Sequence, residues 1–192
     1  IKIYKPWPGA TDTLSYFLIN QGKSIPTHLK DAIIIKKHIT KVISCSTTDI
    51  PLLEAIEMEH TLVGFPEHKY ISSAKTRKRI DAGLIKDIGS LLSLNTEMIL
   101  NINPEVIIGF SSNSDNKAFK LLERSGIKTI MNGSWLESHP LGRAEWIKLY
   151  GYLFEKDKQA QNYFNKIEKN YNEALVLAKQ ATKRPSVLSG NM

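Results

Sequence analysis

Cysteine is almost absent from this sequence, because Cys45 is the only one in 192 residues. A single cysteine cannot form an intrachain disulfide, and four-cysteine zinc sites and paired redox cysteines are excluded with it. Long apolar runs are missing too, since stretches such as residues 32–35 and 106–108 fall far short of the roughly 18 residues that a membrane-spanning helix needs. We therefore expect a globular fold that is held together by packing and has no transmembrane helix.

Sequence signatures of catalysis are also lacking. Where a dinucleotide-binding protein has a Gly-x-Gly-x-x-Gly loop after its first parallel strand, this chain has Ser-Cys-Ser-Thr-Thr at residues 44–48. Neither a phosphate-binding loop nor a Gly-x-Ser-x-Gly nucleophile elbow is present. No sequence neighbour would activate the Cys45 thiol, so we interpret Cys45 as a small buried side chain. The chain is predicted not to be an enzyme.

The net charge is positive, with 26 Lys and Arg against 19 Asp and Glu, which gives +7 and an isoelectric point near 9.4. The densest basic cluster is Lys-Thr-Arg-Lys-Arg at residues 75–79. No aromatic residues are interleaved with it, and no zinc-finger, basic-zipper or RNA-recognition signature occurs. We interpret the cluster as a solvated surface and expect no nucleic-acid partner.

The order of apolar segments predicts an α/β fold. Residues 1–40 are expected to be β-rich, with strands at 1–4, 13–19 and 32–37. Beyond residue 41, strands expected at 42–44, 61–65, 105–110 and 127–131 alternate with helices expected at 49–58, 77–84, 95–102 and 115–124. Asp115 is placed to cap the last of these helices. Such alternation predicts a mainly parallel sheet with helices on both faces.

The last third is helical in pattern. Residues 140–153 predict one helix, and residues 155–183 predict a single long helix without Gly or Pro, spanning roughly 40 Å. An apolar or small-residue stripe follows it at spacings of three and four: Ala160, Phe164, Ile167, Tyr171, Ala174, Ala178 and Ala181. The helix is either a C-terminal packing or dimerising helix, or a strut to a second lobe. Residues 184–190 are typical of an extended segment, and we expect the natural protein to continue past Met192.

Ligands of open α/β sheets bind beyond the carboxyl ends of the strands. Hydroxyl, amide and aromatic side chains follow the expected strands at residues 46–48, 65–70, 110–113 and 132–135. Turns and helix caps have the same composition, so no single segment indicates a ligand site. A cleft is indicated because all four segments follow expected strands and would meet at one edge of the sheet. Ser111 and Trp135 are candidate ligand-binding residues on this basis.

The five histidines form no i, i+4 pair and no His-x-Glu motif. The remaining alternative is that three of them, His60, His68 and His139, converge on a metal ion in the folded protein. We expect no resident metal or other cofactor.

Glu97 stands in the first turn of the helix expected at 95–102, where a carboxylate complements the helix dipole. The apolar face of this helix is formed by Met98, Ile99 and Ile102, and Glu97 points away from it. We expect Glu97 to be exposed, with Leu100 on the same outward side.

An ordered set of segments resembles a known family. The segments are Lys-Val-Ile-Ser-Cys-Ser-Thr-Thr at 41–48, Leu-Val-Gly-Phe at 62–65, Asp-Ile-Gly at 87–89, Asn-Thr-Glu-Met-Ile at 95–99 and Asn-Pro-Glu-Val-Ile-Ile at 103–108. They resemble the periplasmic substrate-binding proteins of ABC importers for iron-siderophores, haem and cobalamin, whose two lobes are joined by one long helix. Residues 138–146, the long helix and residues 184–188 are similar to the lipoprotein branch of that family.

The resemblance implies a division of the chain: a β-rich segment at 1–40, an N-terminal lobe at 41–153, an inter-lobe helix at 154–183 and the start of a truncated C-terminal lobe at 184–192. It implies that Thr47, Thr48, Phe65, His68, Tyr70, Ser90 and Leu91 face the ligand. It also implies that Glu97 docks onto arginines of the membrane permease, because complementary charge orients an encounter. This chain has Ser-Thr-Thr-Asp at 46–49 where the family often has Ser-Pro or Thr-Glu, and Leu91 where an aromatic residue is sometimes found.

The function that the resemblance implies is capture of a metal chelate and its delivery to an ABC transporter permease. The protein would act in the periplasm or at the cell surface, tethered to the membrane by a lipid anchor on a removed N-terminal segment. A stiff single-helix hinge would allow only a small closure motion. The alternatives are a zinc or manganese receptor of an ABC importer and a nucleotide-binding α/β enzyme domain.

Overall fold

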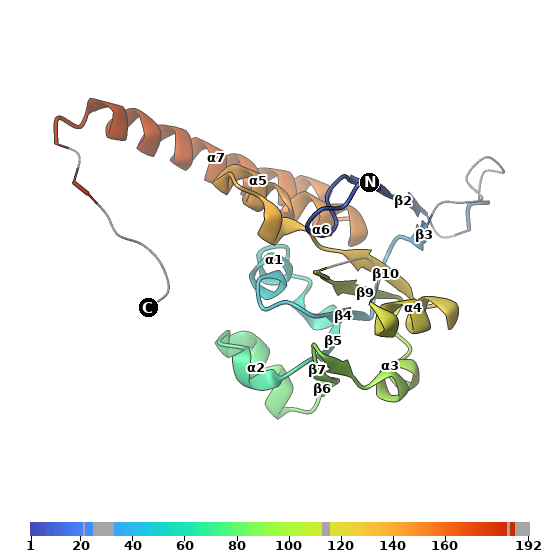
Figure 1. Ribbon diagram of the computed structural model, residues 1–192. Helices are drawn as coiled ribbons and strands as arrows, with labels where there is room; N and C mark the ends of the chain where they lie inside the picture. Colours follow the sequence, from blue (N-terminus) through green and yellow to red (C-terminus); the bar gives the residue numbers. More distant parts are fainter. Residues whose placement is uncertain (21, 25–32, 113–115, 184, 187–192) are drawn as a thin grey trace.

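The computed structural model describes residues 1–20, 22–24, 33–112, 116–183 and 185–186 (Figure 1). Its centre is a five-stranded sheet in the order β10-β9-β4-β5-β6, in which every neighbouring pair is parallel. The strands are β4 (Val42–Ser44), β5 (Leu62–Phe65), β6 (Lys86–Asp87), β9 (Val106–Gly109) and β10 (Lys128–Met131). The predicted α/β architecture is confirmed.

Helices cover both faces of this sheet. They are α1 (Asp49–Ala55), α2 (Ala74–Asp81), α3 (Thr96–Ile102), α4 (Lys117–Arg124), α5 (Pro140–Glu145) and α6 (Ile147–Leu153). Alternate residues of the strands enter two separate hydrophobic clusters. Val42 and Ile108 pack with α1 and α6, whereas Ile43 and Ile107 pack with α3 and α4. Burial on both faces explains why these strands are continuous apolar runs.

The β-rich start of the chain forms its own three-stranded sheet from β1 (Lys2–Ile3), β2 (Leu14–Ile19) and β3 (Ile33–Lys36). β1 and β2 are antiparallel, and β2 and β3 are parallel. Tyr16 connects this sheet to the central one, because its hydroxyl accepts a hydrogen bond of 3.1 Å from the Met131 backbone N–H. Burial raises the pKa of Tyr16 to about 12.

The long helix α7 (Asp157–Gln180) extends past the rest of the described chain (Figure 1). In its first half, Ala160 and Phe164 are buried in the cluster that also contains α6. In its second half, the stripe residues Ala174 and Ala178 are exposed, as are Leu175, Val176 and Leu177. The small-residue stripe is therefore covered only over the first half of the helix. The helix is shorter than predicted, because Glu155 has a φ of 57° and Ala181 is extended.

Two predicted helices begin or end at different residues in the structure. The helix predicted at 140–153 is two helices, because the turn after Glu145 ends α5 and α6 starts again at Ile147. The helix predicted from Asp115 begins at Lys117 and is capped by Asn116, whose side chain accepts from the Phe119 N–H. Asp115 lies outside the described residues, as does the predicted extended segment except for residues 185–186.

The basic cluster at 75–79 has a structural role that the sequence analysis missed. Arg77 donates from Nη1 to the His68 carbonyl at 2.7 Å, and Arg79 donates from Nη2 to the His60 carbonyl at 2.8 Å. Lys75 forms an ion pair with Glu59 at 2.5 Å. Lys75 and Lys78 are exposed, as a surface cluster requires, and the contacts of Lys75, Arg77 and Arg79 also hold α2 against the segments around β5.

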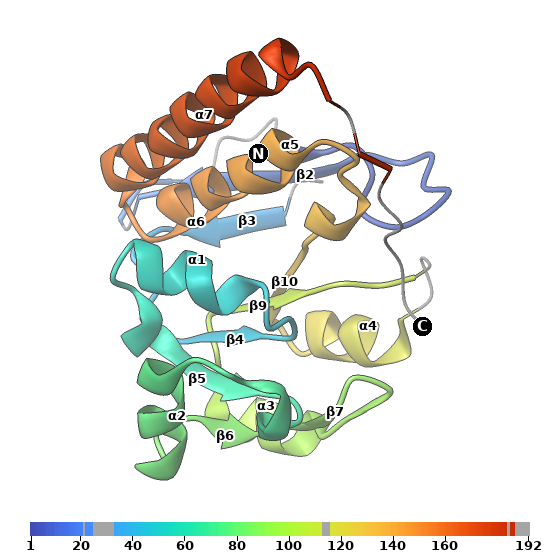
Figure 2. The same ribbon diagram turned by 90° about the vertical axis from the view of Figure 1, so that its left-hand side faces the viewer.

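None of the helices in the described part of the chain has both the length and the apolar character that crossing a bilayer requires. The hairpin of β7 (Gly89–Ser90) and β8 (Ser93–Leu94) lies at the opposite end of the molecule from α7 (Figures 1 and 2).

Candidate ligand-binding cleft

The topology of the central sheet creates a crevice at one point. The chain runs outward from β4 through β5 to β6, then returns to β9 on the other side of β4 and continues to β10. Loops after β4 and β9 therefore diverge, and such a switch point is where open parallel sheets bind ligands. A cleft of about 500 Å³ lies there. It is lined by Ser46, Thr48, Leu52, Phe110, Asn132, Ser134, Trp135 and Arg143.

The lining is apolar with a few polar groups, as in sites for small molecules. Phe110 and Leu52 are half-buried, and Trp135 is 46% exposed, so its ring is available to a ligand. The Ser46 and Thr48 hydroxyls are 2.7 Å apart and hydrogen-bonded. The Arg143 side chain comes from α5, and its Nε donates to the Glu137 carbonyl at 2.9 Å, which fixes the guanidinium at the rim.

A buried polar network lies beneath the cleft, centred on Asp49 at the start of α1. Ser44 at the end of β4 donates to Asp49 Oδ2 at 2.7 Å, and the Asn132 amide after β10 donates to Oδ1 at 2.8 Å. The same amide lies 3.4 Å from the Tyr150 hydroxyl of α6, and that hydroxyl also hydrogen-bonds Asp49. Four elements thus meet at one carboxyl group.

Burial dominates the electrostatics of this network. It raises the pKa of Asp49 to about 6, although hydrogen bonds from Ser44, Tyr150 and Asn132 act in the opposite direction. The pKa of Tyr150 is raised well above its ordinary value by burial and by the nearby Asp49 charge. Burial, with a smaller contribution from Asp49, also raises the pKa of the Cys45 thiol to about 12. Cys45 is buried, as predicted.

The predicted ligand-facing residues are distributed along the carboxyl edge of the sheet. Thr48 and Trp135 line the cleft, and Thr47 is exposed between Ser46 and Thr48. Ser111 is buried and lines a separate cavity of about 180 Å³ together with Trp7.

The other predicted residues lie at the end of β5, in the segment after it and in the hairpin after β6, outside the lining of the cleft. Phe65 is in the hydrophobic core, His68 is half-buried and Tyr70 is 61% exposed. Ser90 and Leu91 belong to the β7–β8 hairpin, where the Ser90 hydroxyl accepts from the Ser93 N–H at 3.2 Å.

Three residues of the site were missed by sequence reasoning. Arg143 lies in the 138–146 stretch, but only the fold of α5 shows that its side chain reaches the cleft. Leu52 lines the cleft although its helical pattern assigns it to the core. Asp49 is a helix-start residue by its pattern, and nothing in the sequence indicates that it contacts Asn132, 83 positions away.

The three histidines considered as metal ligands are separated by the fold. His60 precedes β5 in a 3₁₀ turn, whereas His68 follows that strand. His139 caps α5 by accepting from the Leu141 N–H, and its Nε2 is 3.4 Å from the Tyr171 hydroxyl. Among the residues that the structure describes, His, Cys, Asp and Glu do not gather in a group of three or more that would hold a metal ion.

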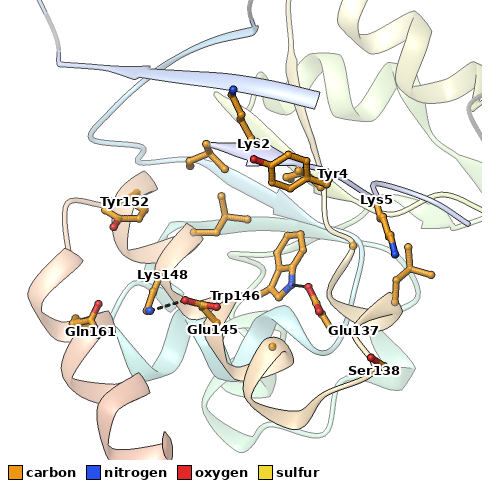
Figure 3. Close-up of a pocket in the computed structure, with 16 residues that line it drawn as sticks. Lys2, Tyr4, Lys5, Glu137, Ser138, Glu145, Trp146, Lys148, Tyr152 and Gln161 are labelled. Atoms are coloured by element: carbon orange, nitrogen blue, oxygen red, sulfur yellow. Dashed lines mark hydrogen bonds and ion pairs between the residues drawn. The ribbon is translucent and has the colours of Figure 1, made fainter. Parts of the chain in front are cut away.

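A larger cavity, of about 720 Å³, lies between β1 and the helices α5 and α6 (Figure 3). Its labelled side chains include Lys2, Lys5, Glu145 and Lys148, and Lys148 pairs with Glu145 at 2.7 Å. Trp146 donates to Glu137 across its wall at 3.2 Å. This cavity is not at the switch point of the sheet, so its size alone does not make it the principal site.

A family model described as "Periplasmic binding protein" matches residues 42–191. The chain belongs to the periplasmic binding protein family. The match begins at β4, so it leaves out the three-stranded sheet and includes the cleft and α7. The resemblance inferred from the ordered segments is confirmed.

Related sequences and structures support the assignment. An uncharacterized lipoprotein of Methanocaldococcus jannaschii, MJ0878, is 31% identical over 87% of this chain and 43% of its own length. A second lipoprotein of that organism, MJ0872, is 25% identical over 97% of this chain and 50% of its own length. The chain thus spans about half the length of these relatives.

Solved periplasmic binding proteins share the fold. The periplasmic haem-binding protein HutB of Vibrio cholerae has a TM-score of 0.60 at 20% identity, over 77% of this chain and 52% of that one. The petrobactin-binding protein YclQ of Bacillus subtilis has a TM-score of 0.57 at 17% identity, over 72% of this chain and 47% of that one. At these identities the likeness concerns the fold.

Proposed function

We propose that this chain is the N-terminal lobe of an extracytoplasmic solute-binding protein that captures a metal chelate, such as an iron-siderophore, haem or cobalamin, for an ABC importer. The observation that carries the proposal is the cleft at the switch point. It combines an accessible indole, a half-buried phenyl ring, three hydroxyls, one amide and one guanidinium. Rings and apolar side chains stack on the flat organic part of a chelate, and a guanidinium pairs with carboxylate or other anionic groups.

Delivery to a permease is supported by the surface around Glu97. Glu97 is exposed in the first turn of α3, whose cap Asn95 accepts from the Met98 N–H at 2.9 Å. Leu100, one turn further, is 41% exposed. An exposed carboxylate beside an apolar side chain suits docking onto a basic protein surface. The names of the lipoprotein relatives support a lipid anchor and a place in the periplasm or at the cell surface.

Ligand binding is tested with the full-length protein and a panel of haemin, cobalamin and ferric siderophores of the catecholate and hydroxamate types. We expect one member to quench tryptophan fluorescence and raise the melting temperature, because a ligand that binds only the folded state stabilises it. Trp135→Ala and Arg143→Ala should each weaken that binding about tenfold or more, which corresponds to about 1.4 kcal/mol.

The matched control is Tyr163→Ala, because Tyr163 is similarly exposed on α7 and does not line the cleft. It should leave the affinity unchanged. Binding by none of the panel, or equal binding by wild type, Trp135→Ala and Arg143→Ala, would contradict the proposed site.

A further inference from the structure

The two walls of the cleft are joined by one side chain that the proposed function does not use. One wall is the segment after β4, with Ser46 and Thr48, and the other is the segment after β10, with Ser134 and Trp135. These segments are far apart in sequence. Beneath them, the Asp49 carboxyl group contacts Ser44, the last residue of β4, and Asn132, the first residue after β10.

Each contact continues to the backbone of its wall. On one side, the Ser44 hydroxyl donates to Asp49 at 2.7 Å and accepts from the Ser46 N–H at 3.2 Å. On the other, the Asn132 amide donates to Asp49 at 2.8 Å while its Oδ1 accepts from the Ser134 N–H at 2.8 Å. Two short chains of hydrogen bonds therefore run from Asp49 to the cleft.

The network suits an ionised carboxylate. Ser44, Asn132 and Tyr150 all donate to Asp49, and an ionised carboxylate accepts hydrogen bonds at both oxygens. A proton on Asp49 would turn one accepting position into a donor. One of the three partners must then reorient, since an unsatisfied polar group in a buried site is costly. The alternative acceptor for the Ser44 hydroxyl is the Ser46 carbonyl, 3.2 Å away, in the cleft wall.

We propose that Asp49 is a positioning residue whose protonation state sets the arrangement of the two cleft walls, through Ser44 on one side and Asn132 on the other. The inference rests on the proposed function only in taking the cleft as the ligand site. It predicts that the ligand-free cleft changes shape as Asp49 gains its proton.

Other titratable groups around Asp49 do not change charge in the same range. Tyr150 on α6 and Cys45, directly after β4, are the titratable partners that interact with it, and burial raises the pKa of both. Asn132 and Ser44, the remaining neighbours, do not titrate. The pKa of Asp49 itself is raised to about 6, which places its proton uptake in an accessible range.

The test uses the full-length protein labelled with 5-fluorotryptophan, without ligand. Fluorine resonances of Trp7, Trp135 and Trp146 are assigned by single Trp→Phe changes. Between about pH 4.5 and about pH 7.5, we expect the Trp135 resonance to follow a one-proton curve with a midpoint near the Asp49 value of about 6. In Asp49→Asn that curve should be lost, because Asn carries no titrating proton.

Two further variants make the assignment specific. Ser44→Ala removes a hydrogen bond that lowers the Asp49 pKa, so the midpoint of the Trp135 curve should move to higher pH. If Asp49→Asn fails to fold, the shift of the midpoint in Ser44→Ala still tests whether the Trp135 curve reports Asp49. His139→Asn removes the imidazole at the start of α5 as a control, and it preserves the cap of that helix because Asn is also a good N-cap.

A Trp135 resonance that does not move in wild type, that moves equally in Asp49→Asn, or that stops moving in His139→Asn would overturn the inference. An unchanged midpoint in Ser44→Ala would also overturn it. Because no ligand is present, the outcome is separate from that of the chelate panel. Failure of every chelate to bind would refute the proposed function and leave the Trp135 titration to decide the role of Asp49.

Discussion

Cys45 and Asp49 are neighbours at the carboxyl end of β4, and burial acts on both in the same direction. Removal from water disfavours the charged form of each, so the pKa of the thiol rises to about 12 and that of the carboxyl group to about 6. Their roles differ because of their partners. Asp49 is held by three donors from three other elements, whereas Cys45 packs with Ile43, Ile99 and Ile107 in the cluster under α3 and α4.

The raised thiol pKa predicts that Cys45 is chemically inert in the folded protein. The thiolate is the reactive form, and its fraction at about pH 8 is negligible when the pKa is about 12. Iodoacetamide should therefore leave Cys45 unmodified in native protein, as measured by intact mass, and should alkylate it fully in urea. Rapid alkylation under native conditions would show that the thiol is exposed or activated.

At the scale of elements, apolar runs and their spacing were enough to predict most of the sheet and its helices. Strand cores such as β9 are buried on both faces, so their sequences are uniformly apolar and easily recognised. The break between α5 and α6 has no such signal, because the residue at the break is Trp146 and not Gly or Pro. The helix that follows buries Ile147 and Tyr150. Arg143 stands in α5, before that break, and its place at the cleft depends on how α5 packs, which has no periodic signal in the sequence.

Helix ends were predicted less well for a similar reason. Asn and Asp are both good caps, so the sequence around residues 115–116 does not distinguish between them. In the structure, Asn116 is the cap, because its side-chain oxygen accepts a hydrogen bond from the Phe119 N–H. The sequence was enough to predict that the site lies at the carboxyl ends of the strands, because a parallel order brings those ends to one edge of the sheet. Which of those side chains share a cleft depends on loop conformations that have no periodic pattern.

The contact between α6 and α7 gives a test at the element scale. A Cβ on Gly151 would lie 2.6 Å from the Ala160 Cβ, so Gly151→Ala forces the two helices apart. We expect it to lower the free energy of unfolding by about 1–3 kcal/mol, as overpacked cores do. Urea unfolding followed by tryptophan fluorescence measures the change.

Gly142→Ala is the matched control for this experiment. Its added Cβ would lie 2.8 Å from Glu137 Oε2, at the end of a flexible side chain whose other oxygen accepts from the Trp146 indole, so that side chain can adjust without moving a helix. Alanine also has the better helix propensity, so stability should be unchanged or slightly higher. An equal fall in the free energy of unfolding in Gly142→Ala and Gly151→Ala would mean that the close contact between α6 and α7 is not the cause of the destabilisation.

At the scale of the whole molecule, the cleft and the docking candidate lie on different parts of the lobe. Glu97 is on α3, whereas the cleft is lined from the segments after β4, β9 and β10 and from helices α1 and α5. A change confined to Glu97 should therefore separate delivery from capture.

Glu97→Ala is expected to reduce uptake of the cargo in cells at least several-fold while leaving the affinity of the purified protein for it unchanged. The charge is removed from an exposed position, so folding should not suffer. Uptake of a labelled chelate and titration of the purified protein provide the two measurements. The control is Glu168→Ala, which removes an exposed carboxylate from α7 instead of α3. It should leave both uptake and affinity unchanged. Weaker ligand binding in Glu97→Ala would instead place Glu97 in the ligand site.

The hydrogen bond between Asp49 and Asn132 has a consequence for redesign of this lobe. Most of the cleft lining stands on loops at one edge of the sheet, while the two hydrophobic clusters that hold the fold lie on its faces. On the proposed function, we expect that exchanging loops would transfer cargo preference without repacking the core. The loops after β4 and β10 are an exception, because a bond across 83 positions ties them together. They must be grafted as a pair, with Asp49 and Asn132 taken from the same donor protein.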